Sequence, residues 1–409
     1  MEEKKFNVLI VGKGSVASAL SRKFCENPII NDVFITDPSS SKHVDIREDD
    51  LTGLLKFVIE NDINLTVPIS DLALKADIVT FFQTNGQLIF GPSKESCEIT
   101  LNKILSKKFL YKIHAQTPKF GIYNKVAQIT DYLSKSNFPV IIRTAENTYI
   151  QDELQVCPTM KSALNFIDNL FIKGETDVLI EDFVFGNNFT AYFITDGYSA
   201  IPLTTVHNYK FKKDDFSGLF KEGVGCYCPD YKISNTIMER VTKIAHDILN
   251  ALDLKGFPYM GILGIECVET GDDRFFVTDL KHSLCRHDAR AVLNLFDDDL
   301  LQIILSCING YFSDEYENIK MNDLSSASLV LFAKAQNKEI KTGDGIDDID
   351  FIDVKKSEDK YFTSGEDILT VTKTASTLTR AKKYLCENIN EIYFDGIEYR
   401  KDICDKIER

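Results

Sequence analysis

The sequence lacks several features that define common classes of protein. None of its 409 residues belong to an apolar stretch near the roughly 18 residues of a membrane span, so no transmembrane helix is predicted. The first residues hold only a short apolar run, Val8 to Gly12, which is too short for a signal peptide. There is no P-loop and no G-x-S-x-G motif, which excludes a Walker nucleotide site and a serine-hydrolase elbow.

Positive charge is also scarce. The chain has 47 Lys and Arg against 62 Asp and Glu, a formal net charge of -15, whereas nucleic-acid binding needs a basic face. The ten cysteines form no C-x-x-C pair and no disulfide framework, which is typical of reduced thiols. We therefore expect a cytoplasmic protein with neither a nucleic-acid nor a membrane partner.

Strands and helices alternate over roughly the first hundred residues. Apolar strands are predicted at 6–11, 33–37 and 65–69, with helices at 51–60 and 72–84 between them. This alternation predicts a parallel, Rossmann-like sheet. A Lys-rich helical region follows at 93–113.

The rest of the chain is expected to form further lobes, since 409 residues are too many for one hydrophobic core. Short strands dominate 120–203, with a helix at 161–170, and a Gly-rich loop is predicted at 218–229. A long amphipathic helix at 235–252 precedes strands at 264–269 and 274–280, which meet at the turn T-G-D-D. Acidic turns and β-rich pieces after residue 311 predict a small C-terminal domain.

Several charged residues stand where strands or helices place them together. Lys103 and Lys107 share one helix face, where most lysines are solvated, and Arg143 ends the apolar strand P-V-I-I-R. Asp279 and Lys281 point to one face of a strand, as an ion pair or as part of a metal site.

The sequence leaves more than one interpretation open for three other sites. The turn Gly12–Ser15 suits either a phosphate or a plain tight turn. The strand end at Glu181 and Asp182 suits either a nucleotide or solvent. A zinc site is the weakest alternative, from a cluster of sulfur and imidazole groups: Cys226, Cys228, His282, Cys285 and His287.

Five motifs in the same order resemble the glycinamide ribonucleotide synthetase (phosphoribosylamine–glycine ligase) family of ATP-grasp enzymes. They are L-I-F-G-P-S-K at 88–94, N-K-I-L-S-K-K-F at 102–109, V-L-I-E-D-F-V-F-G at 178–186, G-V-G-C-Y-C-P at 223–229 and I-Y-F-D-G-I-E-Y-R-K-D-I at 392–403. The resemblance covers nearly the whole chain.

The resemblance implies an α/β fold in three parts. They are a Rossmann-like N-terminal domain at 1–103, an ATP-grasp domain at 104–325 with a lid at roughly 119–183, and a small β-rich C-terminal domain at 326–409. It also implies ligation of a carboxylate to an amine through an acyl phosphate in purine biosynthesis, with ATP and magnesium.

Carried over position by position, the resemblance implies these sites. Its ATP contacts would be Lys103, Arg143, Glu181, Asp182 and Val184. Its substrate contacts would be Asp71, Lys210, Asp214, Gly223, Gly225 and Arg286. Its metal ligand would be Asp279, with Lys281 in place of the second ligand.

The sequence departs from the family pattern at other positions. The charged residues expected at 15–18 are absent, the lid loop at 149–153 is acidic, and Asn188 replaces an acid. These departures favour weak or lost binding of ATP and magnesium, since like charges repel phosphates. Two functions therefore stay open: a working ligase, or an inactive homologue that binds a nucleotide or a partner protein.

Overall fold

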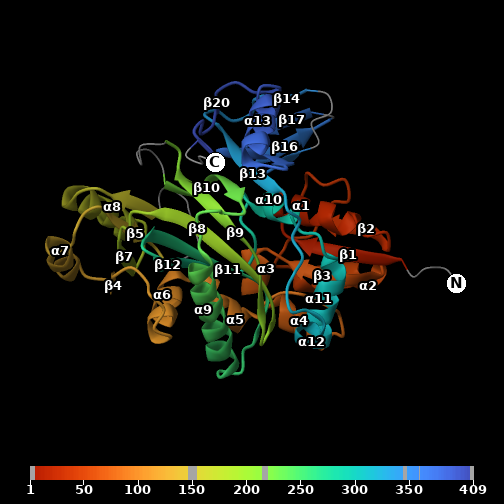
Figure 1. The fold of residues 1–409 in the computed structure, drawn as a ribbon, viewed down its shortest axis with the longest axis horizontal. Helices are drawn as coiled ribbons and strands as arrows, with labels where there is room; N and C mark the ends of the chain where they lie inside the picture. Colours follow the sequence, from red (N-terminus) through yellow and green to blue (C-terminus); the bar gives the residue numbers. More distant parts are fainter. Residues whose placement is uncertain (1–4, 146–153, 214–219, 344–347, 359, 406–409) are drawn as a thin grey trace.

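The computed structural model describes residues 5–145, 154–213, 220–343, 348–358 and 360–405. It is a mixed α/β protein whose described strands form four sheets. In Figure 1 the N-terminal part lies on the right, the C-terminal part at the top, and a small lobe on the left. Within the described residues, no helix is long and apolar enough to cross a membrane.

The N-terminal sheet is parallel, with strand order β2-β1-β3, as the sequence predicts. Its central strand is buried because F-N-V-L-I-V presents apolar side chains to helices on both faces. Its elements and the two helices that follow are β1 (Phe6–Val11), α1 (Gly14–Cys25), β2 (Ile30–Ile35), α2 (Leu51–Glu60), β3 (Ile63–Pro68), α3 (Asp71–Lys75), α4 (Ile78–Thr84), α5 (Lys94–Leu101) and α6 (Lys103–Lys112).

A four-stranded antiparallel sheet of order β4-β7-β5-β6 forms the small lobe, with α7 and α8 beside it (Figure 1). We call it the lid sheet. Its elements are β4 (Phe120–Tyr123), α7 (Val126–Ser134), β5 (Val140–Arg143), β6 (Leu154–Cys157), α8 (Met160–Ile172) and β7 (Val178–Asp182).

The largest sheet has nine strands and joins the middle of the chain to its C-terminal part. Its order is β12-β11-β8-β9-β10-β13-β18-β15, and β20 pairs with β13. The middle of the chain supplies five of these strands and four helices. They are β8 (Asn187–Gly197), β9 (Ala200–Phe211), β10 (Phe220–Cys228), α9 (Asn235–Asp253), β11 (Tyr259–Gly271), β12 (Arg274–Lys281), α10 (Ala289–Leu293), α11 (Leu300–Asn309) and α12 (Phe312–Glu315).

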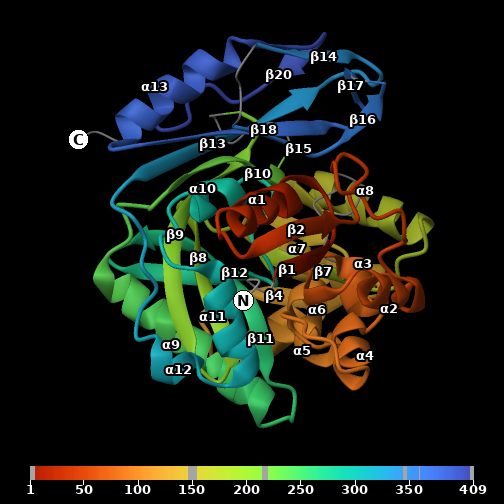
Figure 2. The same ribbon diagram turned by 90° about the vertical axis from the view of Figure 1, so that its right-hand side faces the viewer.

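The C-terminal part adds a second antiparallel sheet of order β16-β17-β14-β19. Figure 2 shows this part above α1 and α10. Its elements are β13 (Ser325–Ala333), β14 (Glu339–Thr342), β15 (Ile349–Phe351), β16 (Val354–Ser357), β17 (Lys360–Thr363), β18 (Asp367–Ala375), α13 (Leu378–Ile389), β19 (Ile392–Tyr393) and β20 (Ile397–Glu398).

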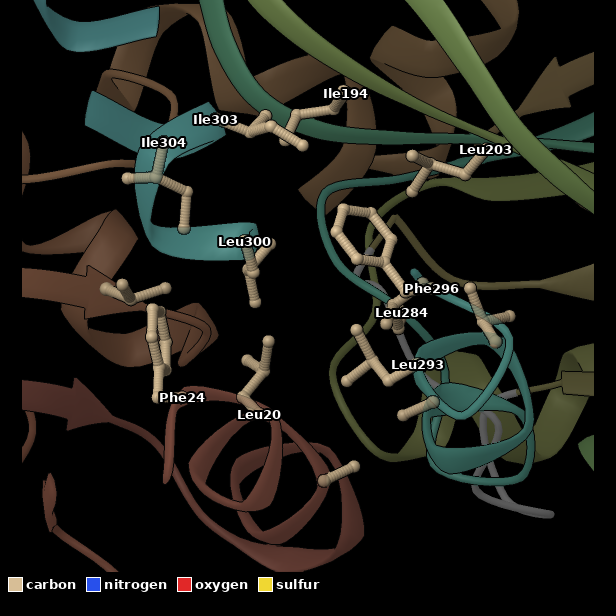
Figure 3. Close-up of a cluster of buried hydrophobic side chains, with 14 of the residues drawn as sticks. Leu20, Phe24, Ile194, Leu203, Leu284, Leu293, Phe296, Leu300, Ile303 and Ile304 are labelled. Carbon is tan, nitrogen blue, oxygen red and sulfur yellow. The ribbon is translucent and has the colours of Figure 1, made fainter. Parts of the chain in front are cut away.

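A shared apolar core ties the N-terminal sheet to the large sheet. Leu20 and Phe24 of α1 point toward Leu300 of α11, and Ile194 and Leu203 of the large sheet lie in the same cluster (Figure 3). Burial of such side chains contributes roughly 1.5–3 kcal/mol each. The core therefore fixes the position of the first turn, Gly12–Ser15, relative to the large sheet.

Two local predictions were wrong, and a third region is divided. The helix predicted at 72–84 is two helices, because Asp77 adopts a left-handed conformation at φ 67°. The region 93–113 is helical as predicted, but it consists of two helices, since extended Asn102 interrupts it and the Asn102 side chain accepts a hydrogen bond from the Leu105 amide. The predicted loop at 218–229 contains β10, which pairs with β9 and β13. The proposed domain boundaries stay predictions.

Candidate functional site

Five charged side chains form a buried cluster where α6 and the lid sheet meet β12. We call this group, whose members are at most 6% exposed, the inner charge cluster; it consists of Lys103, Lys107, Arg143, Glu181 and Asp279. Lysines on a helix were expected to be solvated, so the burial of Lys103 and Lys107 corrects that prediction. The reason is that their helix face packs against strands that carry carboxylates.

Asp279 is the acid that most of these cations share. Its carboxylate lies 2.5 Å from Lys103 Nζ, 3.3 Å from Lys281 Nζ and 3.5 Å from Arg143 Nη1. Burial alone would raise the pKa of Asp279, but these cations outweigh it and hold the pKa well below its usual range. Burial lowers the pKa of Lys103 to about 8, against the opposing effect of Asp279.

Glu181 holds the other side of the cluster. Its carboxylate lies 2.7 Å from Lys107 Nζ and 2.8 Å from Arg143 Nη2. Burial raises the pKa of Glu181, but Arg143 and Lys107 outweigh it, so the net shift is downward. The strand end at Glu181 therefore faces partners rather than solvent.

A small cavity of ≈40 Å³ adjoins this cluster between the lid sheet and the large sheet. Arg143, Glu181, Asp182 and Val184 all line it. The structure thus brings together four of the five predicted ATP contacts around one cavity. The fifth, Lys103, does not line this cavity and instead forms an ion pair with Asp279. We call this region the cleft.

A second group of charges surrounds Lys281 at the end of β12. Lys281 Nζ lies 3.3 Å from Asp279, 3.6 Å from Glu222 and 4.0 Å from Glu266. Lys210 donates to Glu266 at 2.7 Å and to the Glu222 carbonyl at 2.5 Å. The predicted substrate residue Lys210 is therefore engaged in holding two acids in place.

A much larger cavity of ≈770 Å³ opens beside this group. It lies between the N-terminal sheet, the segment after β12 and the C-terminal part, and its lining includes Gly12–Ser15, Asp71, Lys281, Arg286 and Asp367. We call it the cavity. Lys281 and Glu222 line it as well, so the charged group around Lys281 joins the cleft to the cavity.

Arg286 and Asp71 both line the cavity. Arg286 pairs with Glu222 at 3.3 Å and with Asp367 at 3.2 Å, and its side chain is 41% exposed. Asp71 Oδ1 lies 3.2 Å from His282 Nε2; burial raises the pKa of Asp71, but His282 outweighs it. Both predicted substrate contacts thus face the same space.

The turn Gly12–Ser15 reaches this cavity at the start of α1. The Gly14 amide donates to Asp37 at 2.5 Å, and Ser15 donates to the Arg286 carbonyl at 2.7 Å. The Gly14 amide hydrogen is thus already bound by a protein carboxylate. This favours the interpretation of Gly12–Ser15 as a tight turn rather than as a phosphate site at that amide.

Two predicted substrate glycines are packing residues on β10 and line neither the cleft cavity nor the large cavity. A Cβ on Gly223 would stand 2.3 Å from the His287 ring, and one on Gly225 would stand 2.9 Å from the Ser328 carbonyl oxygen. They let their strand approach its neighbours closely. The remaining predicted contact, Asp214, and the acidic loop at 149–153 lie outside the described residues.

Within the part of the chain that the structure describes, Cys285, His287 and Asp288 are the only three side chains placed closely enough to hold a metal. Asp288 already accepts hydrogen bonds from the Tyr192 hydroxyl and the Cys285 amide, and His287 Nε2 faces Asn208 at 2.9 Å. The other members of the zinc alternative, Cys226, Cys228 and His282, lie outside that group.

Sequence reasoning missed Glu222 and Glu266. Glu266 stands opposite Asp279 in the β11–β12 register, so the predicted hairpin contained the signal that pairs them. Glu222 lies on β10, in the stretch 218–229 that the sequence predicts to be a loop.

The chain matches two family models over adjoining ranges. They describe the phosphoribosylglycinamide synthetase N domain, at residues 6–100, and its ATP-grasp (A) domain, at residues 101–276. Together they cover more than half of the chain.

Curated relatives have low identity but cover nearly the whole length. The chain is 25% identical to a phosphoribosylamine–glycine ligase of Fusobacterium nucleatum, over 97% of both chains. It is 24% identical to the enzyme of that name from Haemophilus influenzae, again over 97% of both.

Solved structures show the same fold. A phosphoribosylamine–glycine ligase of Thermotoga maritima matches with a TM-score of 0.82 at 19% identity, covering 97% of this chain and 100% of that one. A biotin carboxylase domain from Hydrogenobacter thermophilus, solved with MgADP and bicarbonate, matches at 0.71 and 12% identity, covering 96% of this chain and 91% of that one.

Proposed function

The chain belongs to the phosphoribosylglycinamide synthetase family, and we propose that it is an ATP-dependent ligase of the phosphoribosylamine–glycine type in purine biosynthesis. The named relatives carry out ligation of this kind, and they align with the chain from end to end. The proposal specifies ATP as the phosphoryl donor, a carboxylate as the acceptor and an amine as the second substrate.

One observation carries the proposal: the cleft and the cavity meet at Lys281. Lys281 contacts Asp279 on the cleft side and lines the ≈770 Å³ cavity on the other. A nucleotide in the cleft would place its terminal phosphate at this junction, next to substrates in the cavity. Proximity of this kind is what phosphoryl transfer to a carboxylate requires.

Each part of the cleft has a role in this proposal. Backbone groups at Asp182–Val184 would contact the base, and Arg143 with Lys103 would face the phosphates. The γ-phosphoryl group passes from ATP to the carboxylate of glycine, which leaves ADP. The amine of phosphoribosylamine then attacks the acyl carbon, forms the amide bond, and releases phosphate and a proton. Arg286, half exposed in the cavity, would hold an anionic group of a substrate.

Magnesium is implied by the family and accompanies ADP in one of the similar structures. The residues at the implied position do not fit it: Asp279 is bonded to Lys103 and lies beside Lys281 and Arg143. A divalent ion needs several oxygen ligands free of competing cations. The proposed steps therefore run without an ion held by these side chains.

Two measurements test the proposal. Thermal unfolding with and without ATP reports binding, because a ligand that binds the folded state raises the melting temperature. Release of ADP in the presence of glycine and phosphoribosylamine reports ligation. We expect both, and we expect Arg286→Ala to keep the thermal shift while losing turnover. No thermal shift at millimolar ATP would contradict the proposal.

The ion pairs of Asp279 favour a second candidate, an inactive homologue that binds a nucleotide without turnover. A thermal shift with ATP but no ADP release in the wild-type chain would support this second function. Turnover that depends on both substrates would exclude it.

A further inference from the structure

We propose that the ammonium group of Lys281 occupies the place where a divalent cation would otherwise bind, among the carboxylates of Asp279, Glu266 and Glu222. The chain would thus carry its own cation at the junction of the cleft and the cavity. The inference rests on the proposed function only in treating the cleft as a nucleotide site.

The geometry around Lys281 carries this inference. Three strands of the large sheet, β12, β11 and β10, each supply one carboxylate, and these lie 3.3, 4.0 and 3.6 Å from Lys281 Nζ. Carboxylate oxygens are the ligands that hard cations favour, but these three, as placed around Lys281, are not among the described side chains that lie close enough to one another to hold a metal. Here a lysine side chain, 4% exposed, fills the space between them.

The balance of charge supports the same conclusion. The described groups around this junction include four carboxylates, those of Glu181, Glu222, Glu266 and Asp279. Six cationic side chains contact them: Lys103, Lys107, Arg143, Lys210, Lys281 and Arg286. Each of these carboxylates already pairs with a cationic side chain, so a divalent ion would add two positive charges that they do not balance, and burying uncompensated charge is costly.

Lys281 differs chemically from the ion that it replaces. Its ammonium donates hydrogen bonds, carries one charge, and is tied covalently to β12. Because it lines the cavity as well, it can donate to a phosphate or carboxylate oxygen of a ligand there. The anionic end of a nucleotide would meet this fixed cation without a protein-bound metal.

Binding of Mn²⁺ alone tests the inference without nucleotide or catalysis. The full chain is titrated with Mn²⁺, and free Mn²⁺ is followed by its electron paramagnetic resonance signal. We expect the wild type to take up no Mn²⁺ at this position. Lys281→Asn removes the ammonium and supplies a ligand oxygen, so we expect its Mn²⁺ affinity to rise by roughly a hundredfold.

Matched variants make the result specific. Lys281→Met removes the charge without adding an oxygen, so it should gain less affinity than Lys281→Asn. Adding Asp279→Asn to Lys281→Asn should abolish the gain, and a urea unfolding curve checks that each variant folds. Stoichiometric Mn²⁺ binding by the wild type, lost in Asp279→Asn, would overturn the inference.

A second measurement separates this inference from the proposed function. The thermal shift caused by ADP is compared in Mg²⁺ and in EDTA. If Lys281 supplies the cation, the ADP affinity that corresponds to the wild-type thermal shift should differ by less than twofold between Mg²⁺ and EDTA. A shift that disappears in EDTA would overturn the inference while leaving nucleotide binding intact. Failure of ADP release alone would contradict only the ligase function.

Discussion

Lys103 in the cleft and Arg286 in the cavity both face carboxylates, yet Lys103 is 1% exposed whereas the Arg286 side chain is 41% exposed. In the cleft, each acid of the inner charge cluster touches at least two cations. In the cavity, ion pairs border a space of ≈770 Å³.

The difference shows that the same residue types serve different ends a short distance apart. Buried charges cannot lose a partner without a large cost, so the inner charge cluster holds the lid sheet, α6 and β12 together. Exposed pairs in water contribute little to stability, so their side chains remain available to a ligand. We therefore expect substitutions in the inner charge cluster to lower stability much more than substitutions of the exposed charges in the cavity.

The largest effect is expected from Asp279→Ala. It leaves Lys103, Lys281 and Arg143 without the acid that they share, so the free energy of unfolding should fall by about 3–5 kcal/mol. Urea unfolding followed by circular dichroism measures this. As a control, Glu366→Ala removes a cavity acid whose side chain is 48% exposed, and it should cost at most about 1 kcal/mol. Equal losses of unfolding free energy in the two variants would contradict the difference between the buried cluster and the cavity.

The next effect concerns Asp288, a buried acid whose hydrogen bonds come from the Tyr192 hydroxyl and the Cys285 amide. Burial raises its pKa to about 7. Between pH 4 and 7 the folded state therefore keeps a proton that the unfolded state releases, and this stabilisation is lost as the pH rises through 7.

We therefore expect wild-type stability to fall relative to Asp288→Asn by about 2–3 kcal/mol between pH 5 and pH 8. Asparagine retains an acceptor for Tyr192 but does not titrate. Unfolding in urea across this pH range measures the difference. A difference that stays constant with pH would show that burial does not set the protonation of Asp288.

Much of this arrangement was readable in the sequence, but only where local pattern decides the structure. The apolar run before Gly12 predicted the first strand, and the period-two pattern placed Asp279 and Lys281 on one face of β12, where they are 3.3 Å apart. The turn T-G-D-D predicted the hairpin that sets Glu266 opposite Asp279.

The rest depends on contacts between distant segments. Lys103 and Lys107 form a polar helix face by sequence, and only docking against Glu181 and Asp279 buries them. Likewise, Gly223 and Gly225 suggested a loop, because glycine disfavours strands unless a neighbour approaches closely. Here the His287 ring fills the place of a Gly223 side chain.

Gly223→Ala should have an intermediate effect. The new Cβ would stand 2.3 Å from the His287 ring, which is held by a hydrogen bond to Asn208, so overpacking should cost about 1–3 kcal/mol. The measurement is again urea unfolding, in a double-mutant cycle with His287→Ala. If the clash causes the loss, alanine at 223 should cost less in the His287→Ala background. Additive losses would rule out the clash.

The smallest effect on stability is expected from Arg286→Gln. The lost pairs with Glu222 and Asp367 border the cavity, so unfolding free energy should change by at most about 1 kcal/mol, and less in 0.5 M salt, which screens exposed charges. Unfolding curves at low and high salt measure this, with Asp279→Ala as the salt-insensitive counterpart. A large, salt-independent loss would mean that Arg286 belongs structurally with the inner charge cluster. A small loss leaves its guanidinium available for an anionic substrate, because a contact that contributes little to folding can be exchanged for a ligand at little cost.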